Sequence, residues 1–179
     1  GRVPGDPEYR KLKWQEWWER EGQFKPHPLT GINARFPIKK PRKSAMLAEF
    51  VGILLGDGGI SKQQVIITSH RIDDREYIKF VIKMVKKLFG VKPGIHHRKD
   101  SVADAIVISR VELVDYCIKY LGLKSGNKIE QRIDIPEWIK QSKKYKLACA
   151  RGLIDTDGSI FTHSYKVNSK LYSYKKLCF

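Results

Sequence analysis

Two aspartates that stand 100 residues apart, Asp57 and Asp157, occupy equivalent places in a repeated segment. Each is followed by a glycine, and each closes a run whose apolar residues recur at helical spacing. A carboxylate at the C-terminal end of a helix meets the negative end of the helix dipole, which disfavours it by about 0.3–1 kcal/mol. One such aspartate is readily explained as an ordinary turn residue. Two at equivalent positions predict a shared function.

The repeat also conserves small residues inside the two predicted helices. The segment FVGILLGDGGI at Phe50–Ile60 aligns with ARGLIDTDGSI at Ala150–Ile160. A glycine in a helix interior costs about 1 kcal/mol relative to alanine, so a contact should offset it. Small residues four apart allow two helix backbones to approach closely. We therefore predict that the two helices pack in parallel and bring Asp57 and Asp157 together, through the interface residues Gly52, Gly56, Gly152 and Thr156.

Adjacent carboxylates favour a bound cation. They repel each other, and one takes up a proton unless positive charge lies between them. Oxygen ligands without a cluster of His or Cys select Mg²⁺ or a similar hard ion such as Mn²⁺. Such ions activate water and stabilise charge on the attacking and leaving oxygens of a phosphodiester. The pattern therefore predicts metal-dependent phosphodiester hydrolysis.

The charge of the chain points to an anionic partner. It has 35 Lys and Arg against 19 Asp and Glu, a formal net charge of +16. Nucleic acid is the usual partner of such a protein, and a basic protein that is merely soluble is the alternative. The basic residues spread over the whole chain, which argues against a membrane surface. No apolar run approaches the roughly 20 residues needed to span a bilayer, and no signal-peptide pattern is present, so we expect an intracellular protein of the cytoplasm, nucleoid or an organelle matrix. Three widely spaced cysteines suggest neither a zinc site nor a disulfide framework.

The chain divides into three predicted regions. Residues 1–43 combine a tryptophan-rich helix, residues 9–22, with a basic, proline-rich arm over residues 23–43. We expect the tryptophans to be buried against the next domain; stacking on bases is the alternative. The arm either tracks a phosphate backbone or is a solvated strap. Residues 44–134 form a first unit, and residues 135–179 begin a second one.

The first unit is predicted to be a compact α+β fold. A helix begins at the candidate cap Ser44, and residues 60–69 form one long strand or a strand pair. An amphipathic helix, a hairpin and a further helix follow, at residues 73–89, 91–97 with 103–109, and 111–121. The order is α-β-β-α-β-β-α. In the second region we predict a short helix, a long helix and a hairpin, at residues 135–139 and 144–157 and about a turn at 168–169.

Both repeated segments resemble the LAGLIDADG motif of homing endonucleases, the second closely (ARGLIDTDG) and the first more loosely (FVGILLGDG). The element order after the first motif matches that family's unit, and the resemblance covers residues 44–179. It implies that Asp57 and Asp157 bind Mg²⁺ or Mn²⁺, with Gly56 and Thr156 beside them. It also implies a saddle of strands on a long, nearly palindromic double-stranded DNA site and a staggered double-strand break. Leu55 departs from the motif, at a position that is not the metal ligand.

The remaining candidate site residues are chosen by position. Lys128, in the loop GLKSGNK, is the candidate catalytic basic residue, with an ordinary surface lysine as the alternative. Candidate DNA contacts are polar residues of the predicted strands and turns, because such side chains reach base edges or phosphates. They are Lys62, Gln63, Gln64, Thr68, His97, Arg98 and Lys99 in the first unit, and His163, Lys166, Asn168 and Lys170 in the second.

The second unit is expected to be incomplete, because 22 residues follow Asp157 where the first unit has many more. We expect a full-length form to be a monomer, and the fragment to self-associate through an uncovered strand edge. Whether the truncated chain itself cleaves DNA or is inactive is left open. Two alternatives use the same fold: a non-catalytic, sequence-specific DNA-binding regulator, and an RNA-splicing maturase that binds structured RNA. Whether an intron, an intein or a free-standing gene carries the reading frame is left open.

Overall fold

The N-terminal helix stands apart from the core. The computed structural model describes residues 6–25, 36–99, 101–128, 130 and 134–178. Helix α1, Pro7–Arg20, begins where the Asp6 side chain accepts a hydrogen bond from the Glu8 backbone, and a short 3₁₀ helix, η1, Gly22–Phe24, follows it. No residue of α1 is buried, and Trp14 is 56% exposed. The expectation that the tryptophans are buried against the next domain is therefore wrong. Most of the proline-rich arm, residues 26–35, lies outside the described residues.

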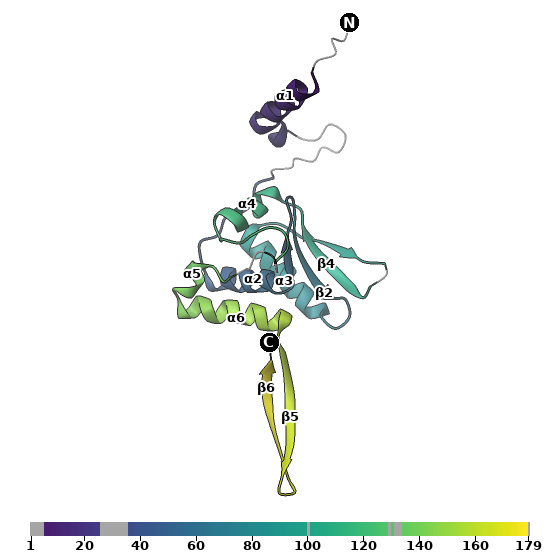
Figure 1. The fold of residues 1–179 in the computed structure, drawn as a ribbon, viewed down its shortest axis with the longest axis vertical. Helices are drawn as coiled ribbons and strands as arrows, with labels where there is room; N and C mark the ends of the chain where they lie inside the picture. Colours follow the sequence, from purple (N-terminus) through teal and green to yellow (C-terminus); the bar gives the residue numbers. More distant parts are fainter. Residues whose placement is uncertain (1–5, 26–35, 100, 129, 131–133, 179) are drawn as a thin grey trace.

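The first unit is an α+β fold, as predicted. Its sheet is antiparallel in the order β1-β2-β4-β3, and helices lie against one side of it (Figure 1). The elements run in the predicted order: α2 Ala45–Leu55, β1 Gly58–Ile60, β2 Val65–His70, α3 Arg75–Phe89, β3 Gly94–His97, β4 Ala103–Ile108 and α4 Val111–Lys119.

Local sequence accounts for the two main helices of this unit. The Ser44 side chain accepts a hydrogen bond from the Leu47 backbone and caps α2. Residues 47–54 of α2 are all buried, and all but Glu49 are apolar or glycine, which fits a helix that runs through the core. Helix α3 is amphipathic and ends at Gly90, whose φ of 71° is the left-handed conformation that glycine adopts freely.

The sheet separates a core side from an open side. Burial alternates along β2: Val65, Ile67 and Ser69 are buried, and the residue after each of them is half-exposed. On β4, Ile106 and Ile108 join the same buried cluster, which includes residues of α2, α3 and α4. The helices therefore cover one face of the sheet, and the other face has no layer of helices on it.

The second region adds a helix and a separate hairpin. Helices α5, Glu137–Lys140, and α6, Lys143–Asp157, precede strands β5, Ser159–Val167, and β6, Lys170–Cys178. The strands form a two-stranded sheet that projects from the end of α6 (Figure 1). Asn168 and Ser169 have φ of 46° and 65°, as a tight hairpin turn requires. Within the described ranges, no helix is long and apolar enough to cross a membrane.

Helices α2 and α6 run side by side in parallel, with their backbones in contact (Figure 1). A Cβ atom on Gly52 would overlap the carbonyl oxygen of Cys149, and one on Gly152 would overlap that of Glu49. One turn further on, a Cβ on Gly56 would overlap the Thr156 hydroxyl. Because contacts advance in the same direction along both helices, the two C-terminal ends meet.

A bidentate ion pair fastens the same two helices. Glu49 of α2 is only 4% exposed, and Arg151 of α6 donates from Nε to its Oε1 over 2.7 Å. A second guanidinium nitrogen of Arg151 pairs with the other carboxylate oxygen. Two parallel charge-assisted hydrogen bonds fix direction as well as distance, so the pair sets the register of α6 on α2.

Replacing Gly52 by alanine should separate these helices. Alanine is favoured in a helix by about 1 kcal/mol, but overpacking a buried contact typically costs about 1–3 kcal/mol, and here the clash is with backbone. We expect Gly52→Ala to lower the free energy of unfolding in urea titrations. Gly59→Ala is the matched control, since a Cβ there meets nothing within 4 Å and should change stability by less than about 0.5 kcal/mol. Equal stability of the two variants would contradict the close packing.

Candidate functional site

The two repeated aspartates lie at the ends of the paired helices. Asp157 is the last residue of α6, and Asp57 lies just beyond the end of α2. The space that Gly56 leaves free is taken by Thr156 and by the Asp157 carboxylate, whose Oδ2 lies 3.2 Å from the position of a Cβ on Gly56. The parallel packing therefore brings both aspartates to one end of the helix pair.

The environment of Asp57 disfavours its negative charge. Partial burial raises the pKa of this carboxyl, the neighbouring Asp157 raises it further, and Lys128 opposes the rise. The negative ends of two helix dipoles meet at the same place. Two carboxylates and two helix ends thus create a negative potential that a cation relieves.

Lys128 enters this site from the loop after α4. Its ammonium donates to the backbone oxygen of Leu55 over 3.0 Å and to that of Gly56, the last carbonyls of α2. Burial lowers the pKa of Lys128, and the charges of Asp157 and Asp57 oppose that fall. The lysine chosen by position therefore lies in the aspartate site, and it satisfies carbonyls that the helix end leaves without partners.

The oxygen groups of the site suit a hard divalent ion. Mg²⁺ is usually bound by one or two carboxylates and keeps several waters for substrate oxygens to replace. Asp57 and Asp157 provide such carboxylates. Within the described ranges, no group of three or more His, Cys, Asp or Glu side chains is placed to hold a metal ion. The Thr156 hydroxyl donates to the carbonyls of Gly152 and Leu153 at 3.1 and 3.0 Å. Asp57 and Asp157 would hold the ion, and Gly56 and Thr156 shape its surroundings.

Tyr77 of α3 belongs to this region, and the sequence did not single it out. Its hydroxyl is buried, and among the described residues it has no hydrogen-bond partner. Burial raises its pKa first of all, and Asp155, Asp57, Glu49 and Asp74 raise it further. The hydroxyl is therefore buried within the influence of acids of α2 and α6. Helical periodicity assigns Tyr77 only a place on α3, so only the packing of α3 reveals its neighbours.

The open face of the sheet is hollowed. A depression of about 420 Å³ lies over β2, β4 and β3, lined among others by Gln64, Ile66, His96, Arg98, Val107 and Ser109. Gln64 donates from Nε2 to the Ser109 hydroxyl over 3.0 Å across two strands. Polar, apolar and basic side chains thus share one concave surface. Such side chains can contact base edges, and the basic and polar ones can also bind phosphates.

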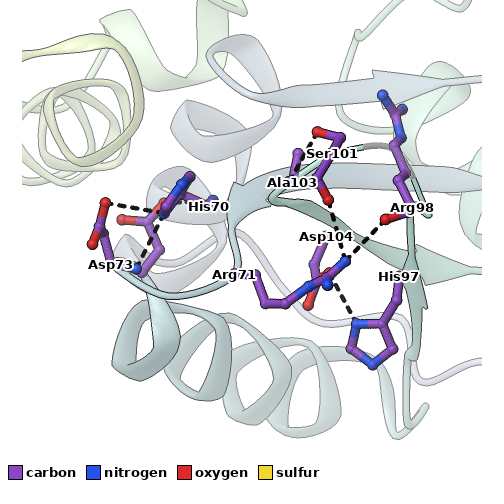
Figure 2. Close-up of polar contacts among 9 residues, drawn as sticks. His70, Arg71, Asp73, His97, Arg98, Ser101, Ala103 and Asp104 are labelled. Atoms are coloured by element: carbon purple, nitrogen blue, oxygen red, sulfur yellow. Dashed lines mark hydrogen bonds and ion pairs between the residues drawn. The ribbon is translucent and has the colours of Figure 1, made fainter.

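A buried aspartate anchors the loop at one end of this hollow (Figure 2). Asp104, 3% exposed, accepts from Arg71 Nε at 2.7 Å and lies 2.9 Å from His97 Nδ1. Arg71 also donates to the backbone oxygens of Arg98 and Ser101. These bonds lower the pKa of Asp104 against the opposing effect of burial. The β3–β4 loop is therefore tied to the body, although it lies on the surface.

The candidate DNA contacts of the first unit fall around this hollow. Lys62 and Gln63 are exposed in the β1–β2 turn, Thr68 lies half-buried on β2 opposite Ala105, and Lys99 is exposed on the β3–β4 loop. His97 stands opposite Asp104 and is bonded to it, whereas His96 stands opposite Ala105 on the open face. His96 was missed because neighbouring strand residues alternate sides, and only the register tells which side is open.

The contacts predicted in the second region lie on the projecting hairpin. His163 and Lys170 share a face with the aromatic rings of Tyr165, Tyr172 and Tyr174, and the His163 ring is 5.4 Å from that of Tyr174. Lys166 points to the other face, and Asn168 forms the turn. The structure therefore places these four residues on one element, divided between its two faces.

Comparison with known proteins finds distant similarity to segments of two archaeal proteins. The replication factor C small subunit of Methanocaldococcus jannaschii is 28% identical over 141 residues, which covers 70% of this chain and 7% of that protein. The tRNA-splicing ligase RtcB of Methanopyrus kandleri is 26% identical over 133 residues, which covers 66% of this chain and 13% of that protein. The chain thus matches a small part of each relative's length. No family model matches the chain.

Removing the Tyr77 hydroxyl should not destabilise the protein. A buried hydroxyl without a partner carries a desolvation cost, so Tyr77→Phe is expected to raise the free energy of unfolding by about 1 kcal/mol. Tyr116→Phe is the matched control, because the Tyr116 hydroxyl donates to the Pro41 carbonyl over 2.6 Å and its loss should cost about 1 kcal/mol. Urea titration of both variants measures the difference; a clear loss of stability in Tyr77→Phe would mean that its hydroxyl is bonded.

Neutralising Asp57 should stabilise the metal-free protein. Because its environment disfavours the charge, Asp57→Asn is expected to raise the thermal unfolding midpoint in EDTA at neutral pH. Mg²⁺ should make the wild type the more stable of the two proteins. At a hundredfold excess over its dissociation constant, Mg²⁺ would stabilise the wild type by about 2.7 kcal/mol and the variant much less. Scanning calorimetry with and without Mg²⁺ tests this. An equal response of both proteins to Mg²⁺ would exclude Asp57 as a ligand.

Proposed function

We propose that this chain is the core of a LAGLIDADG homing endonuclease, which hydrolyses phosphodiester bonds of double-stranded DNA with Mg²⁺ or Mn²⁺. The observation that carries the proposal is the meeting of Asp57 and Asp157 at the ends of two backbone-packed parallel helices. The element order after the first motif, and the resemblance of ARGLIDTDG and FVGILLGDG to the family motif, support it.

The acid site divides the chemical work among three side chains. Asp57 and Asp157 hold the ion, which when bound activates water and neutralises charge on phosphate oxygens. In hydrolysis, the water oxygen bonds to phosphorus, one ester P–O bond breaks, and the leaving oxygen takes a proton. The ammonium of Lys128 lies beside both acids, where it stabilises the negative charge that builds on the phosphoryl group.

The open face of the sheet is the proposed DNA surface. It is concave, it carries Arg98 and His96 beside the uncharged Gln64 and Thr68, and its loop is anchored by Asp104. A loop that is fixed before binding loses less conformational entropy when it contacts DNA. The hairpin β5–β6 adds His163, Lys166 and Lys170 as basic or polar contacts from the second region.

The comparisons favour a segment carried inside host proteins. The two relatives are named for different tasks, and the similar region makes up a small share of each. Because the two relatives have different functions by name, we do not expect the segment that they share with this chain to carry either of those functions. We therefore favour an endonuclease region inserted in a host, as in an intein, over a free-standing gene or one in an intron.

Substituting either aspartate should abolish cleavage and leave DNA binding intact. The assay incubates a randomised duplex library with Mg²⁺, and the proteins are this chain and a longer form with a complete second unit. We expect the longer form to cut a long site, and Asp57→Asn or Asp157→Asn to reduce cleavage at least about 10³-fold, as loss of a metal ligand would. Lys128→Met should reduce the rate about 10²-fold, as loss of one charge-stabilising group does.

Binding measured in the same assay separates the alternatives. Both aspartate substitutions remove one negative charge, so the affinity for DNA should stay equal or rise. Glu16→Gln removes the same charge from the exposed helix α1 and should leave cleavage unchanged. Tight binding of one sequence without cleavage by any divalent ion would instead establish a DNA-binding regulator. Selective binding of a structured intron RNA would establish a maturase.

A further inference from the structure

Helix α3 presents a row of cations to solvent. Arg75, Lys79, Lys83 and Lys87 recur every four residues on its exposed side, and Lys86 lies beside the last of them. The acid on this helix is Glu76, which pairs with Lys79 over 2.7 Å. Among the described residues, no ion pair involves Arg75, Lys83, Lys86 or Lys87.

Such a row is unfavourable in the protein alone. Residues four apart are neighbours on a helix surface, and like charges at that spacing destabilise the helix. Alternating acids would have relieved the repulsion, as Glu76 does for Lys79. An amphipathic helix requires polar residues on its solvent-exposed side, but it does not require that they be positively charged. An anionic partner would offset the repulsion.

The row lies on the opposite side of the first unit from the hollowed face of the sheet. Ile78, Val81 and Val85 of α3 face the buried cluster that also contains the core side of β2 and β4. The cations occupy the other side of α3, away from that cluster. The hollow opens on the other side of the sheet. One straight duplex therefore cannot contact both surfaces.

The geometry of the row fits a nucleic-acid backbone. A helix rises 1.5 Å per residue, so Arg75 to Lys87 spans about 18 Å, with a cation about every 6 Å. Phosphates of one DNA strand succeed each other by about 3.4 Å along the duplex axis, so the row faces about five of them. In the described part of the chain, these cations line neither the hollow over the sheet nor the one beside Lys40 and Tyr120. Lysines on a convex helix meet phosphates without reading bases.

We propose that the exposed row of α3 is a second nucleic-acid surface, which holds the phosphate backbone of a second duplex DNA segment without reading its sequence. A single chain then bridges two duplexes, one on the hollow of the sheet and one on α3. Such bridging lets a protein pass from one DNA segment to another while it remains bound, which serves the search for a rare site.

The experiment measures bridging by the protein chain without metal. The protein is loaded on an immobilised duplex at low salt, and capture of a second, fluorescent duplex of unrelated sequence is recorded as a function of salt. Lys83→Gln with Lys87→Gln is the test variant. Lys143→Gln with Lys146→Gln on α6 is the matched control, because it removes two charges from exposed lysines of another helix. Lys83→Arg with Lys87→Arg is the charge-retaining variant. Analytical sedimentation tests whether each protein is a monomer, and a thermal unfolding transition tests whether each is folded.

We expect the wild type, the α6 control and the arginine variant to capture the second duplex, and the glutamine variant of α3 to lose most of the capture. Its slope of log affinity against log salt should fall by about 1.8, for two lost phosphate contacts. Capture equal to wild type, an equal loss in the α6 control, or capture of structured RNA but not duplex DNA would overturn the proposal. Because the assay contains no divalent ion, the result does not depend on cleavage, and failure of cleavage elsewhere leaves it unaffected.

Discussion

The close parallel contact of α2 with α6 is the constraint on which the rest of the structure depends. It requires that Gly52 and Gly152 have no side chain, since a Cβ on either would overlap the backbone of the other helix. The buried Glu49 pairs with Arg151 across the same contact and fixes the register. A shift of α6 by one turn would move it about 5.4 Å and carry Asp157 away from Asp57. Packing of two backbones therefore determines the chemistry at their ends.

The same contact concentrates negative charge where stability alone would avoid it. Two helix C-termini, Asp57 and Asp157 meet at one place. Partial burial raises the pKa of Asp57, and the neighbouring Asp157 raises it further. Lys128 reduces the cost, because its ammonium bonds the last carbonyls of α2. Tyr77 adds a buried hydroxyl without a partner among the described residues. Unfavourable groups gathered at one site are typical of a site kept for function rather than for stability.

The sheet separates the core from the proposed DNA surface by the alternation of its strands. Val65 and Ile67 face the helices, and Ile66 between them lines the hollow. At the edge of the hollow, the buried carboxylate of Asp104 bonds both Arg71 and His97. These bonds hold the exposed β3–β4 loop in position. The core of the first unit thus supports both the acid site on one side and the hollow on the other.

The sequence by itself determined the elements of this protein. The cap at Ser44, the stop at Gly90 and the turn at Asn168 and Ser169 lie where local patterns put them, because each depends on a few neighbouring residues. The repeat also singled out Asp57 and Asp157. Tertiary structure decided what local patterns cannot express. No tryptophan of α1 is buried, the His97 side chain bonds Asp104 whereas His96 stands opposite Ala105, and the buried Tyr77 hydroxyl lies within the influence of several acids. Those facts depend on register and packing between residues far apart in the chain, and helical or strand periodicity gives a side chain its direction within an element but not its neighbour.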